Sequence, residues 1–229
     1  KYGYNYSSLV HKTALWGQVS HHLKHIDWFV GIRYSNTTQW REGIYKNGLD
    51  ANSSQGKSKI FSYNNYTVKG GLTYKIDGRN YLYANGSYET RAPFWDNIFI
   101  SPRVRNLAQN PGSERIGSFE GGYIYNAPRV KLRATGFYTN FQNGSDVLVY
   151  FDDDYFGLAS YTLTNINKVH FGGEFGTEVQ VYKGISISLA ASVGKYYYTS
   201  RQQGVLTIDN QPDVMQKETV YSKNFYVPN

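Results

Sequence analysis

The sequence predicts an all-β protein built as an antiparallel, up-and-down meander, and three observations lead to this expectation. Apolar and polar residues alternate with a period of two over long stretches, as they do along a strand whose successive side chains point to opposite faces. Short turn signals alternate with long polar segments along the whole chain. The alternating stretches show no helical period, so we expect strands in all of them.

The connections between the expected strands come in two lengths. The short ones are clusters of Gly, Pro, Asn or Asp of the hairpin type, and they recur about every fifty residues. Because every second connection is long, we expect tight turns at one end of the sheet and extended loops at the other. The short connections are 24–27, 77–80, 126–129 and 183–184, and the long ones are 41–57, 92–114, 143–160 and 200–217.

Between these connections we expect about eight strands, with a ninth beginning near residue 217. The turn signals bound the first three, and alternation defines the later ones. In 167–181, for example, Val169, Phe171 and Val179 share one face and Lys168, Glu174 and Glu178 share the other. The expected strands are 12–23, 28–40, 58–76, 80–92, 115–126, 129–142, 161–182 and 185–200.

Strand length and residue distribution favour a transmembrane barrel over a soluble sandwich. Several expected strands exceed ten residues, whereas strands in soluble proteins usually have about five or six and tilted membrane-crossing strands need about nine to eleven. Aromatic residues gather near strand ends, as at Trp28 and Tyr196, where amphipathic rings would lie at a bilayer interface. Charged residues lie mid-strand and are expected to line a wet interior. The lumen-facing candidates are Glu89, Arg91, Lys131, Arg133, Lys168, Glu174 and Glu178.

The composition agrees with this class and excludes others. The 229 residues are 17% aromatic and 18% charged, with a net charge of +7, and the charged share is below the roughly 25% of a typical soluble domain. No run reaches the ~18 apolar residues that a transmembrane helix needs. The absence of cysteine excludes a disulfide scaffold, a thiolate metal site and cysteine catalysis. The chain opens at Lys1 with neither an initiator Met nor a targeting segment, so we expect a processed chain or a fragment.

Four segments in sequence resemble motifs of TonB-dependent outer-membrane receptors. The stretch 83–99, centred on Arg91-Ala92-Pro93, resembles the strand and loop of those receptors that contain R-A-P. The stretch 106–115 lies where they carry N-P-x-L-K-P-E-x. Further on, 134–141 is similar to their A-x-x-Y-x-T-x-x strand, and 164–178 to N-x-x-x-a-x-x-x-G-x-E-x-x. Order and spacing agree across about 80–200, whereas the first 75 residues match only in texture.

The resemblance implies a barrel of about 22 strands around an N-terminal plug, of which residues 1–229 supply part of the C-terminal half and no plug. It implies a transport receptor in the outer membrane of a Gram-negative bacterium, which imports a large nutrient such as a siderophore, a glycan, cobalamin or a peptide. The implied partners are the lipid bilayer, the rest of the barrel and its plug, TonB, and a surface lipoprotein. The Tyr- and Asn-rich loops are similar to those of Bacteroidota receptors. No catalysis and no cofactor are expected.

Ligand capture is expected in the long loops, because exposed loop aromatics offer stacking surfaces. Packing of the loops on one another explains the same residues equally well. The candidate ligand-contacting aromatics are Trp40, Phe94, Trp95, Tyr155 and Phe156.

Other kinds of chemistry are weaker interpretations. His21 and His22 would point to opposite faces of one strand, which argues against a shared metal ion. Asp152–Asp154 reads as a solvated loop rather than a cation site. The basic residues share a strand face and form no concentrated stripe, so no nucleic acid partner is expected.

Two other functions stay open at the level of sequence. One is a passive porin, or a small closed eight-stranded barrel acting as an adhesin or structural protein. The other is a soluble β-sandwich carbohydrate-binding module. Strand pairing separates the small closed barrel from a receptor fragment, because a closed barrel must pair its first strand with its last. The charged mid-strand faces disfavour the sandwich.

Overall fold

The computed structural model of the chain describes residues 5–46, 48, 51–101, 103–108, 111–209 and 211–220. These residues form one sheet of eleven strands and two short helical turns, α1 (Ala51–Ser54) and η2 (Trp95–Ile98). No helix in the described ranges is long and apolar enough to cross a bilayer. The strands are β1 (Tyr6–His22), β2 (Ile26–Gly43), β3 (Gly56–Lys57), β4 (Phe61–Lys75), β5 (Asn80–Arg91), β6 (Glu114–Asn126), β7 (Val130–Asp152), β8 (Gly157–Tyr182), β9 (Ile185–Tyr198), β10 (Gln202–Ile208) and β11 (Gln211–Val220).

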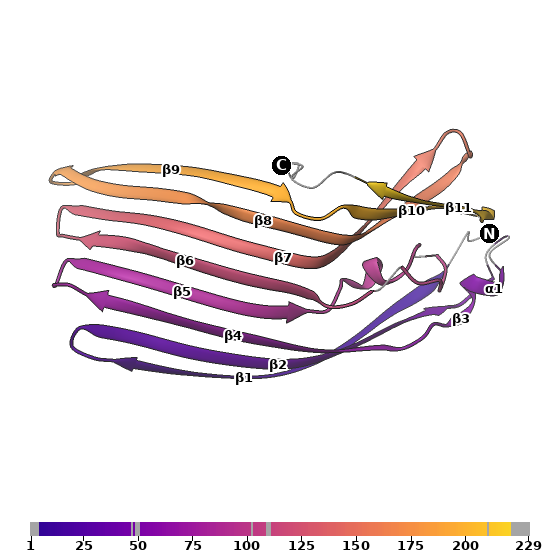
Figure 1. Cartoon of the computed structure of the whole chain (residues 1–229), viewed down its shortest axis with the longest axis horizontal. Coiled ribbons are helices and arrows are strands. Elements are labelled where there is room, and N and C mark those ends of the chain that lie inside the picture. The colour runs from indigo at the N-terminus through magenta and orange to yellow at the C-terminus, as the bar shows by residue number, and fades with distance from the viewer. Residues whose placement is uncertain are drawn as a thin grey trace.

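The sheet is an antiparallel meander, as the sequence predicts (Figure 1). Its order is β1-β2-β4-β5-β6-β7-β8-β10-β11, so nearly every strand pairs with its neighbour in sequence. β9 and β10 share one edge of β8. β9 pairs with residues 168–182 of that strand, and β10 pairs with residues 159–164. The fold class is therefore confirmed as all-β, an up-and-down sheet that forms part of a barrel.

Two of the alternative folds do not agree with this sheet. A sandwich needs a second sheet packed on the first, and the described residues form one sheet only. A small closed barrel needs β1 to pair with the last strand. Within the described part of the chain β1 pairs with β2 alone, so the sheet is open at both edges.

The expected loops at 143–160 and 200–217 are wrong in part. β7 continues to Asp152 and β8 begins at Gly157, so the first of them is mostly a β-hairpin. The second contains β10 and the start of β11. Both segments are rich in turn-forming residues, but strand pairing satisfies their backbone groups and overrides that local preference. In the expected loop at 92–114, the described residues 92–101, 103–108 and 111–113 form no strand, apart from an isolated bridge between Phe99 and Leu107.

The four tight turns expected at 24–27, 77–80, 126–129 and 183–184 lie at one end of the molecule (Figure 1). The opposite end carries the long connection between β5 and β6 and also the short hairpin connections from β7 to β8 and from β10 to β11. The turn between β4 and β5 shows how such a turn is held. Asp77 Oδ1 accepts hydrogen bonds from the backbone nitrogens of Arg79 (2.7 Å) and Asn80 (2.8 Å). These bonds hold the pKa of the Asp77 carboxyl below its ordinary value of 3.8, because they favour the ionised form.

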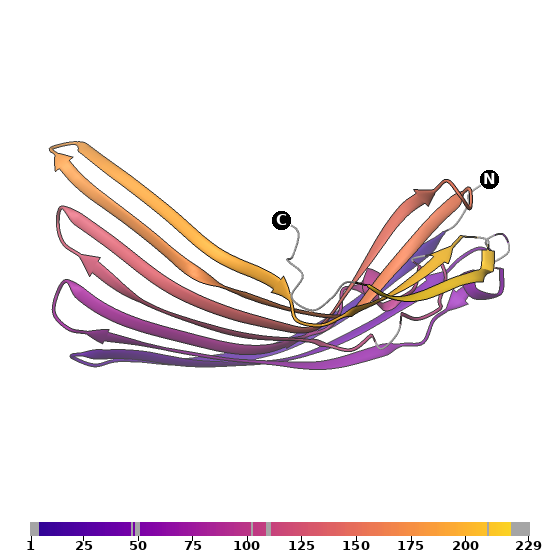
Figure 2. The same ribbon diagram turned by 45° about the horizontal axis from the view of Figure 1, so that its top comes forward.

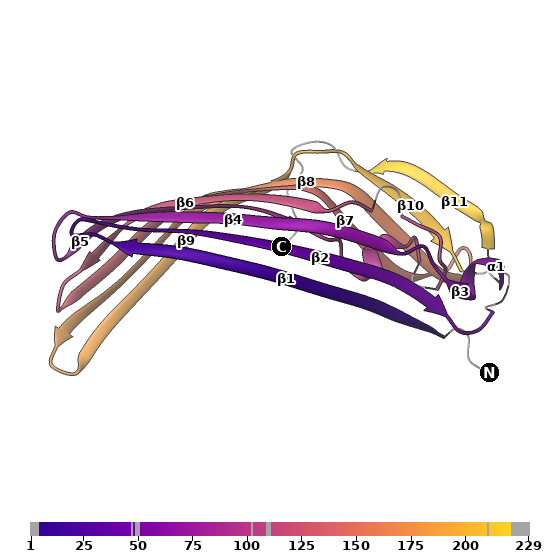
Figure 3. The ribbon, with the colours of Figure 1, turned by 90° about the horizontal axis from the view of Figure 1, so that it is seen from below.

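The pairing register divides the side chains between two faces of the sheet. All seven residues predicted to face the lumen lie on one face, here called the charged face; the pairs Lys131–Glu178, Thr135–Glu174 and Arg91–Glu114 connect them across strands. The opposite, apolar face carries exposed side chains such as Ile32 (63%), Leu189 (60%) and Val193 (76%). The sheet is curved along and across its strands (Figures 2 and 3).

Candidate ligand-binding site

The described part of the connection between β5 and β6, residues 92–101, 103–108 and 111–113, folds onto the charged face at the end opposite the four expected tight turns; we call it the docked loop. Trp95, Ile98 and Phe99 of this loop are buried and form a small core, on which Tyr6, Phe61 and Tyr63 of the strands pack. The rings of Tyr6 and Trp95 are stacked at 5.7 Å. Apolar burial of this kind is worth about 1.5–3 kcal/mol for each large side chain, so the loop is a packed element.

Hydrogen bonds tie the docked loop to several strands at once. Gln39 Nε2 of β2 donates to the carbonyl oxygen of Pro93 at 3.0 Å. On the other side, Asn97 Nδ2 donates to the carbonyl oxygen of Ser145 in β7 at 2.6 Å, and Thr162 Oγ1 of β8 donates to that of Ile100 at 3.2 Å. The loop therefore bridges β2 to β7 and β8 across the charged face.

A buried pair of arginines extends the same bridge to the β10–β11 hairpin. Arg41, almost fully buried, donates to the carbonyl oxygens of Ser54 and Arg103, both at 2.7 Å. Arg103 in turn forms an ion pair with Asp209, with Nε 2.8 Å from Oδ2. Because removing one partner of a buried ion pair leaves an uncompensated charge, this pair holds the hairpin firmly against the docked loop.

Three neighbouring strands are interrupted at one level of the sheet, which we call the bend. Asn143 in β7 and Asn165 in β8 have positive φ angles of 59° and 57°, and the register between these strands shifts after Phe141. At the same level β9 ends and β10 begins. Ser200 lies in that break, where its Oγ donates to the carbonyl oxygen of Asn165 (2.5 Å) and accepts from the backbone nitrogen of Asn167 (2.9 Å). Figure 2 shows that β7 and β8 change direction in the half of each strand that lies at the docked-loop end of the molecule.

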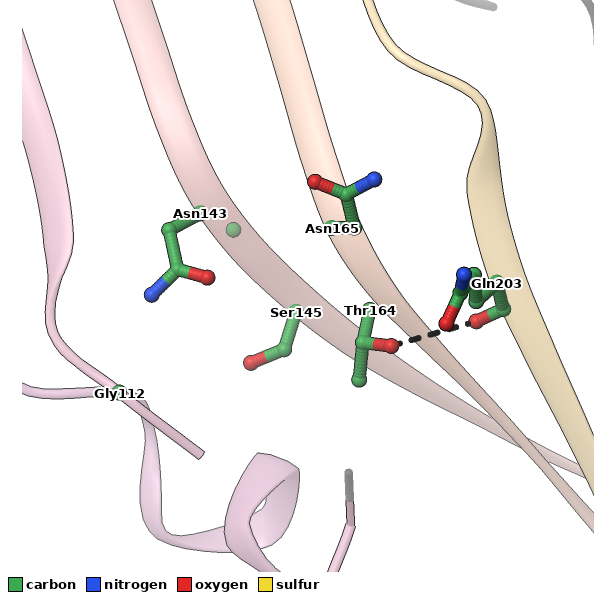
Figure 4. Close-up of a pocket in the computed structure, with 7 residues that line it drawn as sticks. Gly112, Asn143, Ser145, Thr164, Asn165 and Gln203 are labelled. Carbon is green, nitrogen blue, oxygen red and sulfur yellow. Dashed lines mark hydrogen bonds between the residues drawn. The ribbon is translucent and has the colours of Figure 1, made fainter. Parts of the chain in front are cut away.

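A pocket of about 200 Å³, the bend pocket, lies between the bend and the docked loop (Figure 4). A larger groove of about 720 Å³ adjoins it and shares Gly112, Asn143 and Asn165. The bend pocket is lined by Gly112, Asn143, Gly144, Ser145, Thr164, Asn165 and Gln203, and the remaining lining residues of the groove are Phe61, Pro111, Arg115, Gln142 and Asn167.

The structure places the five candidate loop aromatics in different settings. Phe94 and Phe156 have exposed rings, and Arg91 lies over the Phe94 ring at 5.4 Å. Tyr155 is half-buried beside the turn between β7 and β8. Trp95 is in the core of the docked loop, so its ring offers no stacking surface. Trp40 lies within β2, on the face opposite the docked loop, and contacts His11 and Lys57.

Several residues of the predicted charged set make contacts within the sheet. Arg133 donates to the hydroxyl oxygen of Tyr83 (2.9 Å) and lies over its ring at 5.0 Å. The Tyr83 ring in turn covers Gly122, where an added Cβ would come within 2.9 Å of it. Lys131 and Glu178 are 4.0 Å apart, and Lys168 lies over the ring of Phe141 at 5.0 Å. The face is thus a connected polar surface.

The residues that line the bend pocket were not singled out as a site by the sequence. Asn143 and Gly144 form an Asn-Gly pair, which is a turn signal, and in a continuous strand such a pair marks an irregularity. That signal indicates the bend in β7. Nothing local marks Asn165 or Gln203, because their proximity to Asn143 depends on strand register.

Comparison with known proteins supports the fold and goes no further. No family model matches the chain, and no curated protein matches it. Among solved structures, the chain is similar to one titled "Copper transporter OprC", with a TM-score of 0.64 and 17% sequence identity. The match covers 87% of this chain and 32% of that one, so the chain spans about a third of its length. Likeness at this identity establishes the architecture alone.

Proposed function

We propose that this chain is part of the wall of a transport barrel in the outer membrane of a Gram-negative bacterium, with ligand captured at the end that carries the docked loop. The observation that carries this proposal is the division of one open sheet into an exposed apolar face and a charged face. A soluble protein would cover such an apolar face, because large exposed apolar patches mark interaction surfaces.

A lipid bilayer is the partner that fits the apolar face. The strands have the required length: β9 has 14 residues and β6 has 13, and a tilted crossing needs about nine to eleven. Charged groups at mid-strand, such as Glu174 and Arg133, then face a wet interior, where they are tolerated. Among the described residues, the sheet is bounded by β1 on one side and by β9 and β11 on the other, and these edges would join the remaining strands of the barrel.

The finer part of the proposal is import of a large nutrient by a TonB-dependent mechanism. It is supported by the resemblance of the segments around Arg91-Ala92-Pro93 and downstream to receptors of that kind. The docked loop agrees with it, because a packed loop bridging β2 to β8 forms a preformed surface for capture rather than an open entrance. A plug, TonB and a surface lipoprotein would be the further partners.

We do not extend copper from the neighbour's title to this chain. Soft thiolate and thioether ligands select Cu(I), and imidazole suits Cu(II). The chain has no Cys and one Met, and the described residues bring no three His, Asp or Glu side chains into one group.

The proposal is tested on the protein extracted from membranes. We expect an intact mass well above 26.2 kDa, detergent-dependent solubility, and gel migration that changes on heating, as for a folded barrel. A 26.2 kDa species that is soluble without detergent would contradict the proposal. Uptake measured with and without a functional TonB tests the mechanism, since uptake that persists without TonB indicates a passive porin.

A further inference from the structure

The bend pocket has an unusual chemical lining for a site near so many charged and aromatic residues. Its side chains are amides and hydroxyls from three strands: Asn143 and Ser145 of β7, Thr164 and Asn165 of β8, and Gln203 of β10 (Figure 4). No charged or aromatic side chain is among its lining residues. Such a surface both donates and accepts hydrogen bonds without a net charge, and the complementary ligand is neutral and rich in hydroxyl groups.

Two of the amide side chains are held in place through their Nδ2 groups alone. Asn143 Nδ2 donates to the carbonyl oxygen of Ser113 (3.1 Å), and Asn165 Nδ2 donates to that of Arg201 (3.1 Å). The Asn143 backbone nitrogen is further tied to Asn167 Oδ1 (2.8 Å). Within the described residues neither Oδ1 atom of Asn143 and Asn165 accepts a hydrogen bond. These two oxygens are therefore positioned acceptors, which reduces the entropy lost on binding.

The backbone conformation at Asn143 and Asn165 supports a role of these residues in ligand binding. A positive φ favours glycine and strains most other residues, although asparagine tolerates it better than most. At Asn143 and Asn165 the chain has asparagine, although glycine would adopt the positive φ angle at a lower conformational energy. Strained positions of this kind cluster at ligand-binding sites. The shared feature of the two residues is an acceptor directed at one pocket.

The adjoining groove adds an apolar wall. Phe61 and Pro111 line it together with amide groups, and the Phe61 ring is stacked with Tyr63 at 6.3 Å. An aromatic ring beside hydrogen-bonding groups accepts a molecule that has one apolar and one polar side, as a sugar ring does. The charged groups at the groove are Arg115 in its lining, Lys59, whose Nζ lies over the Phe61 ring at 5.6 Å, and Glu114 nearby, which accepts hydrogen bonds from Arg91.

We propose that the bend pocket binds one unit of a neutral saccharide, with the next unit in the groove against Phe61. This inference rests on the proposed function, because it names the class of nutrient that the receptor captures. The asparagine oxygens accept hydrogen bonds from the sugar hydroxyls, and Ser145 and Gln203 complete the set. The unit in the bend pocket is expected to be uncharged because that pocket has no cation in its lining; Arg115 lies in the groove only.

Glycine substitutions provide the sharpest test of this site. Asn143→Gly and Asn165→Gly remove the amides and suit the positive φ angles, so the backbone conformation is expected to be kept. The hydrogen bonds to Ser113 and Arg201 are lost as well, so the folded state of each variant is checked by its heat-dependent gel migration. The probes are neutral hexasaccharides of glucose, xylose and mannose, an acidic hexagalacturonate, and ferrichrome, each titrated by calorimetry into the full-length protein in detergent. Asn126→Gly is the control, because Asn126 is the exposed last residue of β6 at the other end of the sheet and has no positive φ angle.

We expect at least one neutral hexasaccharide to bind and the double glycine variant to bind it at least about tenfold more weakly, as the loss of one or two hydrogen bonds predicts. The control variant should bind normally. Binding of only the hexagalacturonate or ferrichrome, binding of none of the probes, or unchanged saccharide binding in the double variant would each overturn the inference. The first of these leaves the transport proposal intact, whereas absence of the protein from the membrane fraction removes that proposal by itself.

Discussion

The wall of the sheet and its outer end, beyond the bend, are stabilised in different ways. In the wall, β4 to β9 pair in register between the tight turns and the level of Phe141 and Lys168, apart from one shift between Gln180 and Tyr182 of β8. The exposed side chains of the apolar face have no described part of the chain packed on them. At the outer end the register shifts, and the docked loop supplies a buried core around Phe99. The wall is thus a repetitive structure whose stability depends on the medium that contacts its apolar face. The outer end is instead stabilised by individual side-chain contacts.

This difference predicts that the two regions will respond separately to substitution. Changes at the outer end should release the docked loop and leave the wall assembled. Substitutions on the apolar face should prevent assembly of the protein in the membrane. They should not change the contacts between the docked loop and the strands.

The largest effect is expected at the ion pair between Arg103 and Asp209. Asp209→Ala leaves the Arg103 guanidinium, which is 5% exposed, without its carboxylate, and loss of one partner of a buried pair destabilises by about 3–5 kcal/mol. Hydrogen exchange followed by mass spectrometry should show faster exchange in 92–108 and 202–209 and none in the wall. Uniformly faster exchange would mean that the two regions unfold together.

A smaller effect is expected for a charge placed on the apolar face of the wall. Ile32→Arg puts a guanidinium on the lipid side of β2, where such substitutions cost about 2–4 kcal/mol near mid-membrane. Ser192→Arg is the control, because Ser192 lies on the charged face opposite Glu174. The heat-shifted fraction on gels should fall for the first variant alone. Equal behaviour of the two would argue against lipid on the apolar face.

The ion pair between Lys131 and Glu178 should contribute little. Their charged atoms are 4.0 Å apart, and both side chains are about half exposed or more, so solvent screens the attraction. Glu178→Gln is expected to change the unfolding free energy by less than about 1 kcal/mol. A midpoint shift in urea as large as that of Asp209→Ala would show that the charged face is held by its ion pairs.

The smallest effect concerns pH and the turn at Asp77. Because hydrogen bonds lower its folded-state pKa, the carboxyl contributes stability above the unfolded value, and this stability is lost as the pH falls through and below 3.8. Asp77→Asn should abolish that part of the pH dependence. Thermal unfolding of both proteins between pH 3 and pH 7, about the range in which a carboxyl titrates, provides the measurement. Identical pH profiles would contradict the prediction.

Sequence patterns predicted the wall well because each strand carries its own signal. Alternation in 130–138 and 167–181 assigns residues such as Arg133 and Phe175 to opposite faces before any pairing is known. The same patterns failed at 143–160 and 200–217, where polar, turn-forming residues belong to paired strands. Pairing partners far apart in the chain decide such segments, and local preference has little weight there.

The candidate site was less predictable for the same reason. Loop position identified Phe94 and Phe156 as exposed aromatics, but it did not separate them from Trp95, which the docked loop buries. Asn143 and Asn165 are 22 residues apart and meet only because β7 and β8 pair in a shifted register. A bulge is defined by how two neighbouring strands pair, so it cannot be predicted from the sequence of one strand alone.

The sequence by itself determined the all-β class, the positions of the tight turns and the division of the wall into two faces, because these follow from a two-residue period and from turn chemistry. The tertiary structure alone decided that the described sheet is open, that the docked loop packs onto the charged face, and that amides from three strands surround one pocket. Those features depend on long-range pairing and packing, in which each residue's partner is set by the fold and not by its neighbours in the chain.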